Sequence, residues 1–278
     1  MSWVDVLLEP FQFEFMLRAY GATVLAAVVC ALLSCWLVLI GWSLMGDAVS
    51  HAVLPGVVLA YFFGAPFALG ALIFGVLAVA LIGAIRDTGR IEEGAAIGIV
   101  FTTLFALGLV LVSVIPSQTD LGHIIFGNIL GVSDGDLLQI GILAIAATVV
   151  LLIKRRDLTL FAFDPAHAFA IGLRPKLLSA LLLGVLAVTS VVALQVIGVV
   201  LVVAMLIIPA ATAYLLTDRF NRMLWIAPLL GAVAAVVGIT LSYYLDAASG
   251  ALVVLTQGTI FAIVYLFSPT QGVVPRLL

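Results

Sequence analysis

The chain has 278 residues, of which 65% are hydrophobic and only 9% are charged, and its net charge at neutral pH is −3. Soluble domains carry charges on about a quarter of their residues, so this composition and a mean hydropathy of +1.38 exclude an ordinary water-soluble protein. A transmembrane β-barrel is excluded as well, because its strands alternate over segments of about 10 residues. Solid apolar runs of about 20 residues, long enough to cross a membrane as a helix, predict an all-α, polytopic integral membrane helical bundle.

Apolar spans follow one another along most of the chain. They cover residues 17–40, 44–63, 67–85, 94–115, 137–153, 177–194, 196–216, 224–245 and 250–267. The second span contains Asp47, His51 and Pro55, and it either crosses with a break or crosses only in part. The long apolar run 177–216 exceeds one crossing and is divided near Gln195, its only strongly polar side chain. We therefore predict eight or nine transmembrane helices.

The basic residues indicate which ends of the spans face the cytoplasm. Lysine and arginine favour cytoplasmic loops, and here they gather in alternate connections, at Arg86, Arg90, Lys154, Arg155, Arg156, Arg174, Lys176, Arg219 and Arg222. The intervening connections, 64–66, 116–136 and 246–250, contain neither residue type. This pattern places the carboxyl terminus inside and, with nine spans, the amino terminus outside. Arg18 is the one residue that does not fit it.

An acid and an imidazole lie four positions apart in the stretch GWSLMGDAVSHAVLPG. An aspartate at the centre of a membrane helix costs roughly 2.5–3.5 kcal/mol on insertion scales, so such residues usually mark a transport path. On a helix, Asp47 and His51 are neighbours on one face, and oxygen plus nitrogen donors without cysteine suit Mn²⁺, Fe²⁺ or Zn²⁺. The alternative is a structural ion pair that tethers two helices. Since one chain offers only two ligands here, the metal interpretation asks for two copies related by a twofold axis.

The outer connection 116–136 holds a second acid–imidazole pair, Asp120 and His123. A capped and solvated surface helix explains this pair, and a weak site where metal first binds is the alternative. The apolar centre, 124–130, predicts a short helix against the outer mouth. Its large apolar side chains are the candidates for a gate: Ile124, Phe126 and Leu130.

The inner connection 154–176 predicts a docking element. Asp164 is placed to cap a helix that begins at Pro165 and ends before Gly172. This short amphipathic helix makes Ala166, Phe169, Ala170 and Leu173 available for contact with another protein, and His167 is expected to be a surface residue of the same element. The connection is also the longest polar interval and is too short for a soluble core, so we expect residues 1–278 to form a single transmembrane domain. The chain has no G-x-x-x-x-G-K-S/T phosphate loop, and a separate ATPase bound to the inner face is the expected source of energy.

Four stretches together resemble the membrane permease subunit of bacterial manganese, iron and zinc ABC importers, the divalent-metal ABC-3 permease family. They are LVLIGWSLMGDAVSHAVLPGVVLAYFFG, HIIFGNILGVSDGDLL, KRRDLTLFAFDPAHAFAIGL and LQVIGVVLVVAMLIIPAATAYLLTDRF. The resemblance implies an importer-type permease in the bacterial cytoplasmic membrane. It implies a homodimer, two cytoplasmic ABC ATPases that bind ATP, and an extracytoplasmic metal-binding protein, with membrane lipid around the bundle and no nucleic acid.

The same resemblance assigns roles to residues of this chain. Asp47 and His51 match the family's pair for metal passage, and residues 164–172 match its coupling helix, which fits a groove of the ATPase. The sequence around HAVLPG and LLTDRF is most similar to that of the manganese and iron members of the family. The expected protein is a transport subunit that hydrolyses nothing itself, holds no permanent cofactor, and moves a divalent cation by alternating access.

Two other transport functions fit the same composition. A permease for metal chelates, such as siderophores, has the same architecture but is expected to line its path with larger polar or aromatic groups. A proton-coupled secondary transporter needs no ATPase, but such carriers use acids in several spans. An intramembrane hydrolase is not supported, because Ser43 lacks a G-x-S-x-G elbow and Ser50 points away from His51 on a helix.

Overall fold

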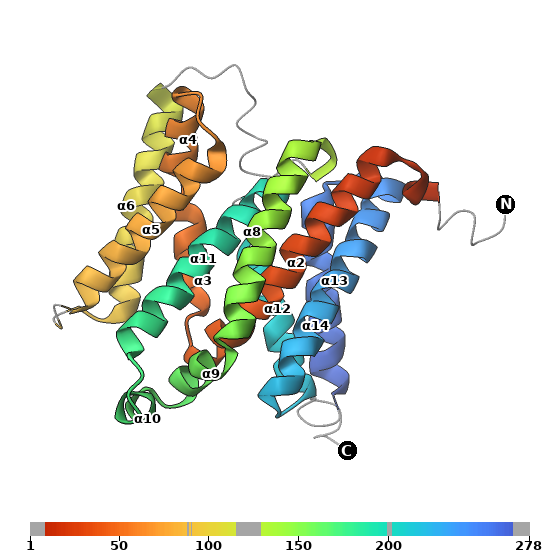
Figure 1. The fold of residues 1–278 in the computed structure, drawn as a ribbon. Helices are drawn as coiled ribbons and strands as arrows, with labels where there is room; N and C mark the ends of the chain where they lie inside the picture. Colours follow the sequence, from red (N-terminus) through yellow and green to blue (C-terminus); the bar gives the residue numbers. More distant parts are fainter. Residues whose placement is uncertain (1–8, 88, 90, 115–128, 199–201, 269–278) are drawn as a thin grey trace.

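A computed structural model describes residues 9–87, 89, 91–114, 129–198 and 202–268. Every regular element in these ranges is helical (Figure 1). The elements are η1 (Glu9–Gln12), α2 (Glu14–Ile40), α3 (Ser43–Ala52), α4 (Leu54–Phe62), α5 (Phe67–Asp87), α6 (Glu93–Val114), η2 (Ile129–Gly131), α8 (Asp134–Ile153), α9 (Arg155–Phe163), α10 (Pro165–Ala170), α11 (Pro175–Ile197), α12 (Val202–Leu216), α13 (Phe220–Leu245) and α14 (Ser249–Phe267).

The predicted polytopic helical bundle is confirmed. Within the described residues, eight helical segments are long and apolar enough to cross a membrane, and Val202–Leu216 is a shorter apolar helix. Together they correspond one to one with the nine apolar runs of the sequence, from which eight or nine transmembrane helices were predicted. This agreement follows from hydropathy, because backbone groups in lipid have to satisfy one another and an apolar run of this length does so as a helix.

Helices α2 and α11 form the centre of the bundle. About 67% of the most apolar part of α2 and 72% of that of α11 are buried, as is 72% of the α3–α4 span, against 22% for α6 and 17% for α14. Helix α2 packs against α8, α11, α12 and α13. Figure 1 shows α4, α5 and α6 together on one side of this centre and α12, α13 and α14 on the other.

Both uncertain segments of the sequence contain a real break. The second span consists of α3 and α4, which meet at Val53, and Pro55 occupies the first turn of α4, where its missing amide hydrogen costs least. The run 177–216 divides just after Gln195, because α11 ends at Ile197 and Gly198 adopts a positive φ of 77°. The division near Gln195 was predicted to within a few residues of its position, whereas for the second span a break was expected without a position.

The basic connections lie at one end of the bundle. In Figure 1 the α5–α6 link, α9, α10 and the α12–α13 link all lie at the lower end, and the start of α2 lies at the opposite end. The exception, Arg18, is compensated by acids: its Nη1 donates to Oδ1 of Asp134 at 3.1 Å, and its Nη2 lies 3.9 Å from Oε1 of Glu14. Two carboxylates thus neutralise the single cation near this end of α2.

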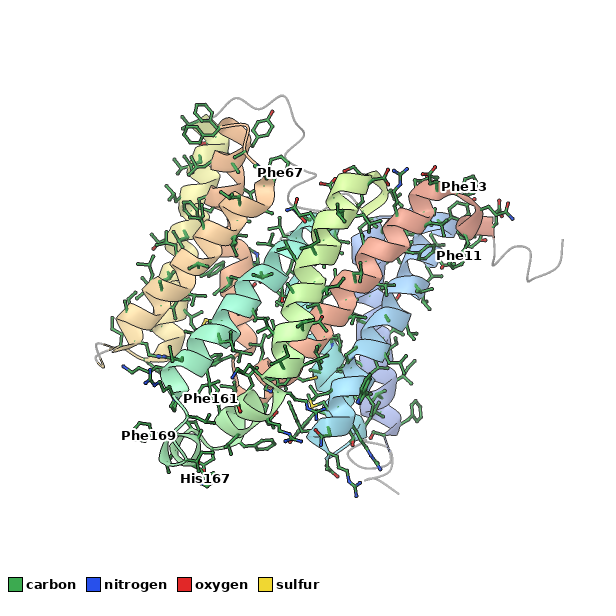
Figure 2. All side chains as sticks on the ribbon, in the orientation of Figure 1. Phe11, Phe13, Phe67, Phe161, His167 and Phe169 are labelled. Atoms are coloured by element: carbon green, nitrogen blue, oxygen red, sulfur yellow. The ribbon has the colours of Figure 1, made fainter. Side chains whose placement is uncertain are left out.

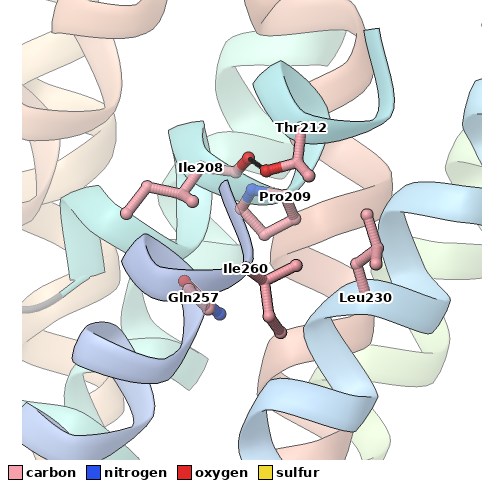
Figure 3. A pocket seen from close by; sticks show the side chains of 6 residues that line it. All are labelled: Ile208, Pro209, Thr212, Leu230, Gln257 and Ile260. Atoms are coloured by element: carbon pink, nitrogen blue, oxygen red, sulfur yellow. Dashed lines mark hydrogen bonds between the residues drawn. The ribbon is translucent and has the colours of Figure 1, made fainter. Parts of the chain in front are cut away.

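A narrow pocket lies between α12, α13 and α14 (Figure 3). Its lining consists of Ile208, Pro209, Thr212, Leu230, Gln257 and Ile260. Pro209 interrupts the amide ladder inside α12, while the Thr212 hydroxyl donates to the Ile208 carbonyl at 2.7 Å. Gln257 is only 3% exposed, and neither atom of its amide has a hydrogen-bond partner in the part of the chain that the structure describes.

Candidate metal-transport site

Helix α3 carries the two predicted ligands into the bundle. It packs against α5, α6, α11 and α12, so the site lies among four spans. Gly46 permits the close approach to α12, since a Cβ at this position would lie 3.0 Å from Cδ1 of Leu206. Asp47 directly follows Gly46 and His51 lies one turn further along α3, so both side chains lie near the helices that pack against α3.

Asp47 and His51 are neighbours, as predicted, and their geometry indicates which nitrogen of the imidazole carries a proton. Nδ1 of His51 lies 3.1 Å from Oδ1 of Asp47 and 3.0 Å from the Asp47 backbone oxygen. A backbone carbonyl only accepts hydrogen bonds, so Nδ1 is the nitrogen that carries the proton. In the tautomer with the proton on Nδ1, Nε2 carries the lone pair, and it has no hydrogen-bond partner among the described residues.

This arrangement differs in one respect from the simple chelate that the sequence suggested. Asp47 uses Oδ1 to hold the imidazole, and the nitrogen that points away from this bond is Nε2. A carboxylate that receives the distal N–H of a histidine is a common support for metal-binding imidazoles, because it fixes the tautomer and the ring direction. The pair therefore offers Nε2 of His51 and the second oxygen of Asp47 as donors.

Both ligands are accessible but sheltered. The exposed fraction is 16% for the His51 side chain and 35% for Asp47. Asp47 and His51 both belong to α3, so their contact does not tether two helices, which was the alternative interpretation. Within the described ranges no group of three or more His, Cys, Asp or Glu side chains gathers around a possible metal position. One chain thus supplies two protein donors here.

Two phenylalanines complete the surroundings of His51. The ring centroids of Phe101 and Phe105, both on α6, each lie 5.3 Å from that of the imidazole, with interplanar angles of 78° and 79°. Sequence reasoning missed this contact. The available signal was an aromatic pair four residues apart in the span 94–115, which matches the spacing of Asp47 and His51.

The other predicted outer residues are described only in part. Asp120, His123, Ile124 and Phe126 lie outside the residues that the structure describes. Leu130, the last gate candidate, belongs to the short helix η2 and is 45% exposed. The binding and gating roles of this segment remain predictions.

The short helix that the sequence predicts in the inner connection is present. The Asp164 carboxylate caps α10 by accepting from the His167 amide at 2.9 Å, and Pro165 is its first residue. The helix ends at Ala170, one residue earlier than expected, and Gly172 adopts a φ of 90° in the turn that follows. Figure 2 shows His167 and Phe169 at the tip of this element, away from the bundle.

The exposed face of α10 includes most of the predicted contact residues. Ala166, His167 and Ala170 are exposed, and Phe169 is 72% exposed. Ala168 is fully buried and anchors the helix to the rest of the chain. An exposed phenylalanine on a rigid, capped helix is a suitable anchor for a partner protein.

The chain matches a known family of transport proteins. Residues 12–268 match the ABC 3 transport family. The chain is 49% identical over 270 residues to the manganese transport system membrane protein MntB of Synechocystis sp., covering 97% of this chain and 88% of that protein. It is 45% identical over 269 residues to the chelated iron transport system membrane protein YfeC of Yersinia pestis, covering 97% and 92%.

A solved structure shares the whole fold. PsaBC from Streptococcus pneumoniae, in complex with Fab, contains a chain that aligns with a TM-score of 0.90 and 37% identity, covering 99% of this chain and 100% of that one. The architecture, the spans and the family match agree, and they make this chain a multi-pass transport subunit of the bacterial inner membrane. The chain belongs to the ABC 3 transport family, which confirms its resemblance to the membrane permeases of metal ABC importers.

Proposed function

We propose that this chain is the membrane permease of an ATP-driven importer for a divalent transition metal. Mn²⁺ and Fe²⁺ are the favoured substrates, and Zn²⁺ is a third candidate. The observation that carries the proposal is the Asp47–His51 pair, which is sheltered between four membrane helices and keeps one imidazole nitrogen and one carboxylate oxygen unengaged.

The donor chemistry supports this substrate class. Imidazole and carboxylate together suit first-row divalent cations, whereas Cu⁺ prefers thiolates and thioethers. The two cysteines, Cys30 and Cys35, are buried on α2 and do not belong to this group. The names of the relatives, a manganese transporter and a chelated iron transporter, favour the same metals.

A pair of permeases is part of the proposal. A first-row cation takes about four to six ligands, and Asp47 and His51 supply two. A second copy facing the first across a twofold axis supplies two more of the same kind. The ion is then held by two symmetric pairs that no single chain provides.

Energy and delivery come from partners in this proposal. Helix α10 presents Phe169 on the side where the basic connections gather, and it fits the role of the coupling helix that an ABC ATPase grips. Closure of two ATPases moves the inner helices and alternates the access of the path between the two sides. An extracytoplasmic binding protein delivers the metal, and the segment 124–130 forms part of the outer gate.

A permease for metal chelates is the second candidate, because the Yersinia pestis relative is named for chelated iron. Uptake into vesicles that contain this chain and its ATPase, read out by mass spectrometry of the metal, separates the possibilities. The proposal predicts ATP-dependent uptake of free Mn²⁺ or Fe²⁺. Uptake of a chelate that free metal does not inhibit would favour the second candidate. Uptake without the ATPase, driven by a proton gradient, would overturn the ATP-driven mechanism.

A further inference from the structure

Helix α6 packs closely against α3, which carries the proposed site, and against α4. A buried stripe of Val100, Leu104 and Gly108 runs along α6, and a Cβ on Gly108 would lie 2.9 Å from Cγ of Leu54 at the start of α4. The absence of a side chain on Gly108 therefore lets α6 lie directly on the α3–α4 unit. Phe101 and Phe105 flank this stripe and are half-buried where the helices meet.

The phenyl rings of Phe101 and Phe105 both pack against the imidazole of His51. They lie one helical turn apart with centroids separated by 6.0 Å and an interplanar angle of 23°. The His51 ring stands nearly perpendicular to both, at 5.3 Å from each centroid. Perpendicular aromatic rings at this separation attract, because the positive edge of one faces the negative face of the other.

The imidazole is thus held from two sides. Its Nδ1 donates to Asp47 on its own helix, and its ring rests on Phe101 and Phe105 of another helix. Turning the ring by half a revolution about χ2 would exchange Nδ1 with a carbon and would break the bonds to Asp47. Contact with the two phenyl rings favours the ring orientation that keeps these bonds.

We propose that Phe101 and Phe105 are positioning residues of the transport site. They hold the His51 ring so that Nδ1–H stays on Asp47 and Nε2 remains the nitrogen presented to the transported cation. This inference rests on the proposed function and adds to it two residues of α6 that do not themselves bind metal. Removing a hydrogen-bonding partner of a metal-binding imidazole typically changes metal affinity by about 10–100-fold, and loss of the Asp47 bond that the phenyl rings help to keep should have an effect of that order.

The test uses the full chain in lipid with 15N-labelled histidine, together with uptake by the complex of chain and ATPase. The chain has three histidines, so loss of one signal in the His51→Gln variant assigns the His51 nitrogens. The inference predicts a protonated Nδ1 and an unprotonated Nε2 in the wild type. In Phe101→Leu/Phe105→Leu we expect a mixture of the two tautomers and a KM for Mn²⁺ about 10–100-fold higher, with the maximal rate within about twofold.

A matched control exists on α14. Phe261 and Tyr265 form a similar stacked pair, 6.0 Å apart with an interplanar angle of 16°, and they contact no histidine among the described residues. Replacing both by leucine should leave the tautomer and the KM unchanged. The single variant Phe105→Leu serves if the double variant does not fold, and Phe105→Tyr, which keeps the ring, should restore the wild-type values.

The outcomes are distinct. An unchanged tautomer in the leucine variants overturns the inference, even where the KM rises, because the effect is then only one of packing. A tautomer that changes while KM stays at the wild-type value also overturns it. If the proposed function is wrong, the wild type takes up no metal. The histidine signals still report whether the phenylalanines hold the imidazole ring.

Discussion

Gly56 of α4 and Gly70 of α5 meet backbone to backbone. A Cβ added to either residue would overlap the carbonyl oxygen of the other, so the helices of this hairpin approach as closely as their main chains allow. Small residues at such crossings are typical of membrane helices, where packing rather than water drives association. This crossing positions α4, and with it the end of α3 that carries His51.

The crossing gives a stability prediction. Gly70→Ala should destabilise the chain by about 1–3 kcal/mol, because overpacking forces the two backbones apart, and the melting temperature of the purified protein should fall by several degrees. Gly83→Ala is the matched control on the same helix, since its Cβ would meet nothing within 4 Å. Equal melting temperatures for the two variants would contradict the crossing.

Gln257 gives a second stability prediction with the opposite sign. Each unsatisfied buried polar group costs about 1–3 kcal/mol, and both atoms of this amide lack a partner among the described residues. Gln257→Leu has a similar volume and no polar atoms, so it should raise the melting temperature. Thr256→Val is a nearby control, because the Thr256 hydroxyl is satisfied by the Leu252 carbonyl at 2.7 Å. A lower melting temperature for Gln257→Leu would show that the amide has a partner.

The cap of α10 is expected to matter for coupling. Asp164→Ala removes the acceptor for the His167 amide and should destabilise this short helix by about 0.5–2 kcal/mol. ATP hydrolysis by the complex should then proceed with less metal uptake per ATP. Asp164→Ser keeps a capping oxygen and should retain near wild-type coupling; a loss as large as that of alanine would reject the role of the cap.

Phe169 is expected to anchor the ATPase. Truncation of an aromatic anchor at an interface commonly costs more than about 1–2 kcal/mol, so Phe169→Ala should weaken copurification of the ATPase about tenfold or more. Phe62 is the control: it is also well exposed, at 60% against 72%, but it lies at the end of α4, far from α10. Equal recovery of the ATPase from both variants would place the interface elsewhere.

Most of the fold could be predicted from the sequence because hydropathy alone determines the spans. The first predicted span began at residue 17, and α2 begins at Glu14; the last ended at 267, where α14 ends. The boundaries shift by a few residues because helices extend into the polar interface. The cap at Asp164 was predicted as well, because capping depends only on local residues.

The contacts between distant parts of the chain could not be predicted in this way. Phe101 and His51 are 50 positions apart. The four-residue spacing of Phe101 and Phe105 matches that of Asp47 and His51, but it does not indicate that α6 packs against α3. The helical period predicted that Asp47 and His51 share a face, but not that Nδ1 would bond to the Asp47 backbone oxygen. That bond depends on the rotamer of His51, which α6 fixes from outside α3.

Manganese uptake by the Asp47→Ala variant tests the central claim most directly. In vesicles that contain the chain and its ATPase, the initial ATP-dependent rate should fall to background, while the variant still assembles with the ATPase. Asp47→Asn keeps the shape of the side chain and an acceptor for His51 but removes the charge, so it should also fail. Uptake by Asp47→Ala close to the wild-type rate would contradict the assignment of the metal path to Asp47 and His51.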